Sequence, residues 1–215
     1  MLMMFADALS DTHAELAKRA LSELVPVLSK SDDAGVQGRL PMLEGLLRRL
    51  DLPGNQIELA GTFLDGTKLD WASYRGKVVL VDYWATWCGP CRAEVPNVLE
   101  NYLKYHDKGF DVIGISLDET REAAEGYVQQ TNIPWPSIFS EVESERGWQA
   151  PMAVKYGITG IPTAILVDQE GKVVSMNARG PQLGALLEKL LGKPGEEAAA
   201  VEASNESEQT AQSAR

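Results

Sequence analysis

Residues Val79–Cys91 read VLVDYWATWCGPC, and this stretch contains both cysteines of the chain. The run Lys77–Trp84 is nearly continuous in apolar and β-branched side chains, which is typical of a central strand buried on both faces. A helix is predicted to follow over residues 90–107. Cys88 and Cys91 are therefore expected where a buried strand passes into a helix.

This setting predicts that the two cysteines are a redox-active pair. Cysteines three positions apart in the first turn of a helix can close a small disulfide ring. The unpaired N–H groups and partial positive charge of the helix N-terminus favour the nucleophilic thiolate. Cys88 is expected to be exposed and to attack a partner disulfide, and Cys91 to be shielded and to resolve the mixed disulfide. Pro90 suits the first turn, where its missing N–H costs little.

Other uses of the cysteines fit the sequence less well. A structural zinc site needs four ligands, and His13 and His106, the two histidines, stand at no matching spacing. A structural disulfide of such short span would stabilise the fold little. Inert buried cysteines would not explain the strand–CGPC–helix order. No metal and no cofactor are predicted.

Composition narrows the class of protein further. The chain has 215 residues, 44% of them hydrophobic, so it can form a sizeable core. No apolar run approaches the roughly 18 to 20 residues that cross a bilayer, so no membrane span is expected. The net charge of −11 argues against nucleic acid as a partner, because phosphates would be repelled.

Three segments are predicted along the chain. Residues 1–53 form a helical N-terminal extension, in which leucines recur at near-helical spacing. Residues 55–192 form an α/β domain, and residues 193–215 a disordered acidic tail without aromatic side chains. The extension is expected to be a helical hairpin that packs on the next domain or on another chain.

Within residues 55–192, strands and helices alternate before a closing hairpin and helix. This order indicates an α/β fold with a mixed sheet. A hairpin is expected around Asp65-Gly66. The remaining predicted elements are strands Asp111–Leu117, Thr163–Val167 and Lys172–Met176, and helices Glu119–Gln130 and Leu183–Leu191.

The stretch Val79–Cys91 resembles the active-site strand and motif of the thioredoxin superfamily. Residues Leu64–Gly76 (LDGTKLDWASYRG) and Arg92–Glu119 are similar to its TlpA/ResA-like branch, with a redoxin-type (AhpC/TSA) domain. Residues Gly157–Val174 (GITGIPTAILVDQEGKVV) are similar to the superfamily's second active-site loop. The resemblance covers about residues 55–192. It implies a thioredoxin-like fold, a mixed central sheet flanked by helices, preceded by the helical extension.

The resemblance also implies roles for residues outside the cysteine pair. Pro162 is expected to follow a cis peptide bond and to lie against the cysteines, with the Ile161 backbone pairing with an extended substrate. Asp82 is expected to be buried with a raised pKa and to exchange a proton with Cys91. The alternative for Asp82 is a structural acid satisfied by backbone donors. Thioredoxin's lysine partner of this carboxylate is absent, because Gly114 aligns with it.

The predicted substrate groove lies around the cysteine motif. Trp87, Gly89 and Pro90 are expected to contact the substrate together with Ile161. Trp135 and Trp148 are further candidates for partner recognition, with core packing as the alternative for both.

The predicted function is that of a thiol–disulfide oxidoreductase acting on protein thiols and disulfides, as the reductant, and supplied by an upstream electron donor. One alternative is a peroxiredoxin-like thiol peroxidase, although Ala85 stands where peroxiredoxins carry Thr or Ser. Another is a redox-competent adaptor whose N-terminal helices bind a partner. The resemblance favours a periplasmic or other extracytoplasmic location, and a true start at Met1 would favour the cytoplasm. The sequence assigns no oligomeric state.

Overall fold

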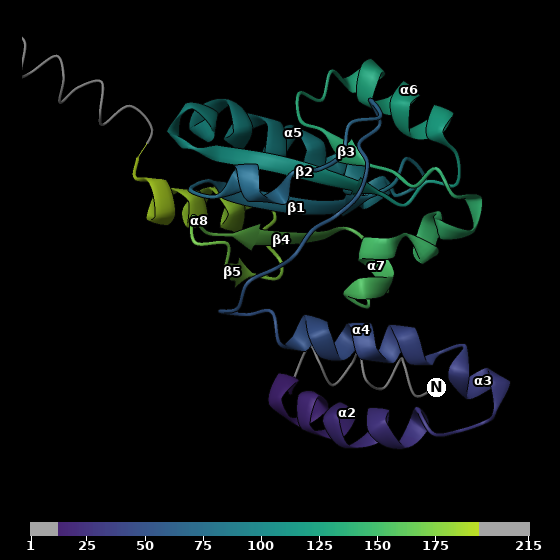
Figure 1. Ribbon diagram of the computed structural model, residues 1–215. Coiled ribbons are helices and arrows are strands. Elements are labelled where there is room, and N and C mark those ends of the chain that lie inside the picture. Colours follow the sequence, from purple (N-terminus) through teal and green to yellow (C-terminus); the bar gives the residue numbers. More distant parts are fainter. Residues whose placement is uncertain (1–12, 194–215) are drawn as a thin grey trace, which may run out of the picture.

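The computed structural model describes residues 13–193 (Figure 1). Its centre is a sheet with strand order β3-β2-β1-β4-β5. Strand β1 runs parallel to β2 and antiparallel to β4, so the sheet is mixed, as predicted. The strands are β1 Val78–Trp84, β2 Phe110–Ser116, β3 Ser137–Ile138, β4 Thr163–Val167 and β5 Val173–Ser175.

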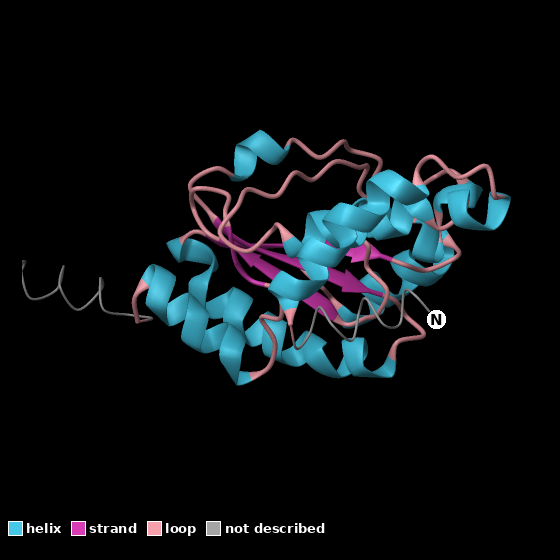
Figure 2. Cartoon of the chain, turned by 90° about the horizontal axis from the view of Figure 1, so that it is seen from below, coloured by secondary structure: helices cyan, strands magenta, loops and turns pink. Residues whose placement is uncertain are grey.

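Helices cover the sheet and extend beyond it (Figure 2). In the sheet domain they are α5 Gly89–Tyr105, α6 Arg121–Thr131, α7 Pro151–Lys155 and α8 Pro181–Leu191. The N-terminal part contains α2 Ala14–Leu28, α3 Ala34–Gln37 and α4 Leu40–Leu50. Short 3-10 helices are Trp71–Tyr74, His106–Lys108, Glu143–Glu145 and Gly147–Gln149.

Strand β1 is the buried axis of the domain. Its successive side chains point to opposite faces of the sheet. Val79, Val81 and Tyr83 join one core with residues of α6 and α7. Val78 and Leu80 join a second core with residues of α5 and α8. Burial on both faces explains why β1 is an almost uninterrupted apolar run in the sequence.

The predicted strands and helices of the sheet domain are present, with ends that differ by a few residues. The hairpin around Asp65-Gly66 is reduced to a single antiparallel bridge between Thr62 and Lys68. Strand β3 and helix α7 were not predicted, because two and five residues are too short to show a hydrophobic period.

The N-terminal helices form the expected hairpin, which lies along one side of the sheet domain (Figure 1). Leu21 and Val25 of α2 pack against Leu43 and Leu46 of α4. Helix α4 in turn packs against α7, so the hairpin contacts the sheet domain of its own chain. The predictions for residues 1–12 and for nearly all of the acidic tail lie outside the described residues.

Two glycines allow α4 to approach α7 closely. A Cβ at Gly45 would lie 2.2 Å from the Val154 carbonyl oxygen, and one at Gly157 would lie 2.3 Å from the Leu46 nitrogen. Gly157 also has φ +54°, a left-handed conformation that favours glycine. Backbone thus meets backbone where the hairpin docks, and neither glycine can carry a side chain without displacing the other element.

The Gly45→Ala variant is expected to lower the free energy of unfolding by about 1–3 kcal/mol, the usual cost of overpacking. Chemical denaturation followed by circular dichroism measures it. The matched control is Gly126→Ala in α6, where an added Cβ meets nothing within 4 Å. That change is expected to be neutral or to stabilise, since alanine is the better helix former. Equal effects of the two variants would contradict the close docking of α4.

Candidate active site

Cys88 and Cys91 form a disulfide at the start of α5, with an S–S distance of 2.01 Å. Cys88 is the residue that caps the helix, and its Sγ accepts a hydrogen bond from the Cys91 backbone N–H at 3.2 Å. A sulfur in this position lies at the positive end of the helix. The arrangement can stabilise a thiolate on Cys88 once the disulfide is reduced.

The expectation that Cys88 is exposed is wrong for this oxidised form. Cys88 and Cys91 each retain 5% exposure and belong to the same apolar core. The backbone makes a tight turn here, in which the Cys88 N–H donates to the Ala85 carbonyl at 3.1 Å. The disulfide therefore closes over the core instead of projecting into solvent.

Asp118 anchors the loop that leads from β1 to the cysteines. Its carboxylate is 1% exposed and accepts hydrogen bonds from the Thr86 N–H at 3.0 Å and the Thr86 hydroxyl at 2.6 Å. The Ser116 hydroxyl donates to its other oxygen at 2.9 Å. Sequence reasoning missed Asp118. The available signal was an acidic residue just after a buried strand, which places it close to the loop between β1 and the cysteines.

Removal of this anchor is expected to be costly. The Asp118→Ala variant leaves the buried donors of Thr86 and Ser116 without their acceptor, which costs about 2–3 kcal/mol. Urea denaturation measures the loss, and amide exchange at Thr86 is expected to become faster. Glu122→Ala on exposed α6 serves as the control. An Asp118→Ala variant as stable as that control would show that the network does not hold the loop.

The tryptophans divide between surface and core. Trp87, directly before Cys88, is 55% exposed, and its ring lies 6.1 Å from that of half-buried Trp148. Gly89 and Pro90 are also exposed. Trp135 is 4% exposed and packs on Tyr102, so its recognition role is ruled out in favour of core packing.

The loop of residues 160–162 lies at the same end of the sheet as the cysteines. The Ile161–Pro162 peptide bond is cis, as the resemblance implied. The next residue, Thr163, begins β4 opposite Tyr83 near the end of β1. Because β4 is antiparallel to β1, its start lies beside the strand end that leads into Cys88. Ile161 and Pro162 are half-buried.

Asp82 lies within β1, between Gly114 of β2 and Ala164 of β4. It is half-buried by its neighbours. Burial raises the pKa of its carboxyl to about 7, the nearby charge of Glu94 raises it further, and Arg179 opposes both. A carboxyl with this pKa can take up and release a proton near neutral pH.

The surroundings of Asp82 explain why position 114 is a glycine and not the lysine of thioredoxin. A Cβ at Gly114 would lie 2.3 Å from Ser137 Oγ and 2.8 Å from Trp84 Nε1, so a lysine does not fit there. Positive charge comes instead from Arg179, in the segment between β5 and α8. Glu94 accepts the Gly180 N–H at 2.6 Å and so ties this segment to α5. Sequence reasoning missed Glu94 and Arg179, because the segment shows no pattern that places it beside β1.

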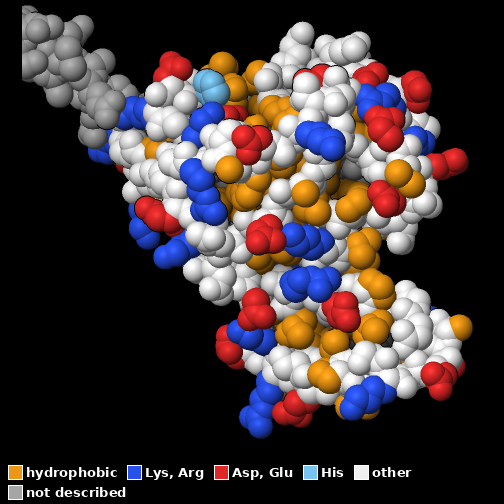
Figure 3. Space-filling view, in the orientation of Figure 1, with side chains coloured by type: hydrophobic (Ala, Val, Ile, Leu, Met, Phe, Trp, Pro, Cys, Tyr) orange, Lys and Arg blue, Asp and Glu red, His pale blue; other side chains and the backbone are white. Residues whose placement is uncertain are grey.

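Charged side chains of both signs alternate with apolar ones on the face that Figure 3 shows. Within residues 13–193, no group of three or more His, Cys, Asp or Glu side chains could hold a metal ion. In the same part of the chain, no helix has the length and apolar character that a membrane crossing requires.

A model of the Redoxin family matches residues 51–184. The chain belongs to the Redoxin family. The matched region of this Redoxin-family chain contains the sheet, both cysteines and Pro162. Most of the N-terminal hairpin lies outside it.

Two relatives of this Redoxin-family chain have the same name. The "Thiol-disulfide oxidoreductase ResA" of Bacillus thuringiensis subsp. konkukian is 35% identical over 132 residues, which are 61% of this chain and 72% of the relative. The protein of that name from Bacillus subtilis is 24% identical over 134 residues, 61% of this chain and 70% of the relative.

Solved structures agree on the thioredoxin-like fold. The thioredoxin domain of a thiol-disulfide oxidoreductase from Bacteroides vulgatus superposes with a TM-score of 0.58 at 31% identity, covering 65% of this chain and 97% of that one. A thiol:disulfide interchange protein from Bacteroides sp. gives the same score and identity over 67% of this chain and 93% of its own. The predicted fold and superfamily are confirmed.

Proposed function

We propose that this chain is a thiol–disulfide oxidoreductase that exchanges electrons with protein thiols and disulfides. The observation that carries the proposal is the Cys88–Cys91 disulfide at the N-terminus of α5, with the Cys91 N–H directed at the Cys88 sulfur. The related proteins named thiol-disulfide oxidoreductases support it.

The reaction starts from the reduced pair. The Cys88 thiolate attacks one sulfur of a partner disulfide, the partner's S–S bond breaks, and its leaving thiolate takes a proton. Cys91 then attacks the Cys88 sulfur of the mixed disulfide and releases the second partner thiol. Two electrons pass to the partner, and the enzyme is left with the disulfide seen here. An upstream dithiol donor returns it to the reduced state.

Asp82 is proposed to accept the proton of Cys91. Leu80 packs in the core that includes Val98 of α5, and Asp82, two residues further along β1, points to the same face. Cys91 is in the first turn of α5. Cys91 must lose its proton before it can attack the mixed disulfide. A carboxylate whose pKa is about 7 accepts that proton at neutral pH and releases it after turnover.

The substrate is proposed to lie between the cysteine loop and the cis-proline loop. Trp87, Gly89 and Pro90 form one exposed side of this groove. The Ile161 backbone next to Pro162 forms the other, where it can pair with an extended segment as an added strand does.

We favour net reduction of partners, because the Gly-Pro pair inside the motif resembles thioredoxin. The test is insulin reduction by dithiothreitol, followed by turbidity. Catalytic amounts of the chain are expected to shorten the lag and accelerate precipitation. A time course identical to dithiothreitol alone would contradict the proposal.

A further inference from the structure

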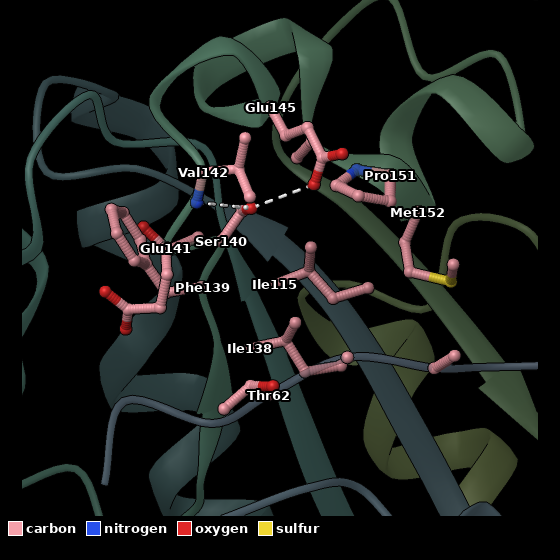
Figure 4. A pocket seen from close by; sticks show the side chains of 14 residues that line it. Thr62, Ile115, Ile138, Phe139, Ser140, Glu141, Val142, Glu145, Pro151 and Met152 are labelled. Carbon is pink, nitrogen blue, oxygen red and sulfur yellow. Dashed lines mark hydrogen bonds between the residues drawn. The ribbon is translucent and has the colours of Figure 1, made fainter. Parts of the chain in front are cut away.

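A cavity of about 330 Å³ opens beside the sheet (Figure 4), and none of the residues proposed for the substrate groove lines it. It lies between residues 60–62, the end of β2, residues 138–145 and the start of α7. Ile115, Ile138 and Phe139 line its buried part with 1, 7 and 2% exposure. Ala60 and Pro151 are exposed, so the cavity opens to solvent.

The cavity suits an apolar occupant. Its lining consists mainly of aliphatic and aromatic side chains, and Met152 contributes an adaptable thioether wall. An apolar cavity of about 150 Å³ already binds benzene, so this one can take a large aliphatic or aromatic side chain. Val142, at the edge, is 51% exposed, so apolar surface continues out of the cavity.

The rim of the cavity is held in place by hydrogen bonds and carries the Glu145 carboxylate. The Val142 N–H donates to Ser140 Oγ at 3.2 Å, and the Ser140 hydroxyl donates to Glu145 at 3.1 Å, as the dashed lines in Figure 4 show. Of the two glutamates that line the cavity, Glu141 is paired with Arg121, and Glu145 forms no ion pair within residues 13–193. Arg146 donates to the backbone carbonyl oxygens of Ser140 and Glu141. A basic residue on an incoming chain would meet the Glu145 carboxylate.

The cavity is connected to the cysteine site through paired tryptophans. Trp87 precedes Cys88, and its ring lies 6.1 Å from that of Trp148. Trp148 belongs to the 3-10 helix Gly147–Gln149, which leads directly into Ala150 and Pro151 of the cavity lining. A bound extended chain advances about 3.3 Å per residue. A substrate residue in the cavity is therefore expected several positions from the reacting cysteine.

We propose that this cavity receives an apolar side chain, flanked by Lys or Arg, of the polypeptide whose disulfide reacts at Cys88. The inference rests on the proposed function and adds a specificity subsite to it. Exposed Trp87 and half-buried Trp148 lie between the two sites, and Glu145 selects the basic neighbour. Chains with an acidic residue at the subsite position are disfavoured, because a carboxylate would be buried among apolar side chains.

The test uses short peptides with a central cysteine in disulfide linkage to thionitrobenzoate, whose release is followed by absorbance. Peptides differ by Leu or Asp at each position three to five residues from the cysteine, on either side, with Lys or Glu beside it. The reduced wild-type chain is expected to show a kcat/KM at least about tenfold higher for Leu than for Asp at one position. Lys beside that Leu is expected to be preferred to Glu.

Two substitutions at Ala60 connect the preference to the cavity. Ala60→Trp covers the mouth and is expected to abolish the Leu preference, while Ala60→Ser, the matched control, retains it. Both variants are expected to reduce hydroxyethyl disulfide, which is too small to reach the cavity, at the wild-type rate. Equal rates for Leu and Asp peptides at every position, or a preference that survives Ala60→Trp, would overturn the subsite alone. Failure of the wild-type chain to reduce hydroxyethyl disulfide would overturn the proposed function itself.

Discussion

The Cys88→Ser variant is expected to lose insulin reduction by at least about 10³-fold, as enzymes do when the nucleophile is removed. Serine has nearly the same shape as cysteine and can still cap α5. Its hydroxyl, however, does not ionise at neutral pH and cannot form a mixed disulfide. The loss is measured as the initial rate of precipitation with dithiothreitol as the donor.

The control for this variant is Ala93→Ser, an exposed position in the next turn of the same helix. It adds a hydroxyl to α5 without touching the cysteines and is expected to keep wild-type activity. Both variants are expected to have the far-ultraviolet circular dichroism of the wild-type chain. Activity of Cys88→Ser within tenfold of wild type would mean that a different group attacks the substrate.

The Asp82→Asn variant is expected to slow the resolution of the mixed disulfide by about 10²-fold, the lower end of what one positioned base contributes. In the wild-type chain the rate of this step is expected to rise with pH through about 7, because the Asp82 carboxylate must be ionised to accept the Cys91 proton. Single-turnover kinetics from pH 5.5 to 8.5, about 1.5 units on each side of that pKa, measure both effects. The variant is expected to lack the inflection near 7.

The pH dependence of the free energy of unfolding is a second test of the raised pKa of Asp82. A residue that affected only the reaction rate would not change it. The carboxyl binds its proton more tightly in the folded chain than in the unfolded one, where its pKa is 3.8. Folding is therefore favoured by this group at low pH, and that advantage is lost as pH rises from about 4 to about 7. The loss is at most about 4 kcal/mol, since one pKa unit corresponds to about 1.4 kcal/mol.

Urea denaturation of the oxidised wild-type and Asp82→Asn chains at pH 4 and pH 8 measures that loss as the change in their stability difference. The first value lies close to the lower end of the 3.8-to-7 interval, and the second lies above its upper end. The asparagine carries no charge, so the variant lacks this contribution to pH dependence. A stability difference that stays constant between the two pH values would show that Asp82 titrates as an ordinary surface carboxyl. The structural alternative, an acid satisfied by backbone donors, would then be preferred.

Sequence patterns predicted those features that depend on residues close together in the chain. Strand β1 is buried on both faces and is apolar throughout, so composition alone predicts it. Cys88 and Cys91 share one helical turn, so their spacing predicts the disulfide. Pro162 required the family resemblance, because no local signal separates a cis proline from a trans one.

The features that sequence reasoning missed depend on contacts between distant segments. Asp118 holds Thr86 across 32 positions, and Glu94 binds Gly180 across 86. Arg179 reaches the surroundings of Asp82 only because β4 returns beside β1 and β5 pairs with β4. The burial of Cys88 accompanies a backbone turn that its sequence does not specify.

The docking of the N-terminal hairpin could not be predicted for the same reason, because it depends on contacts between distant segments. Its leucine spacing predicts helices but not the surface they cover. The choice between its own sheet domain and another chain depends on Gly45 and Gly157, which are 112 positions apart and meet backbone to backbone. Glycine is common in loops, so neither residue signals a docking site when the sequence is inspected alone.

The central claim is that Cys88 is the attacking sulfur and Cys91 the resolving one, and trapping tests it most directly. The reduced Cys91→Ser variant is mixed with a peptide disulfide, quenched with acid and mapped by mass spectrometry after proteolysis. With the peptide disulfide in excess over the thiol that the attack releases, we expect a stoichiometric mixed disulfide on Cys88 that persists. The Cys88→Ser variant, with Cys91 as its remaining cysteine, is expected to form little adduct. A faster and more complete adduct on Cys91 than on Cys88 would contradict the account.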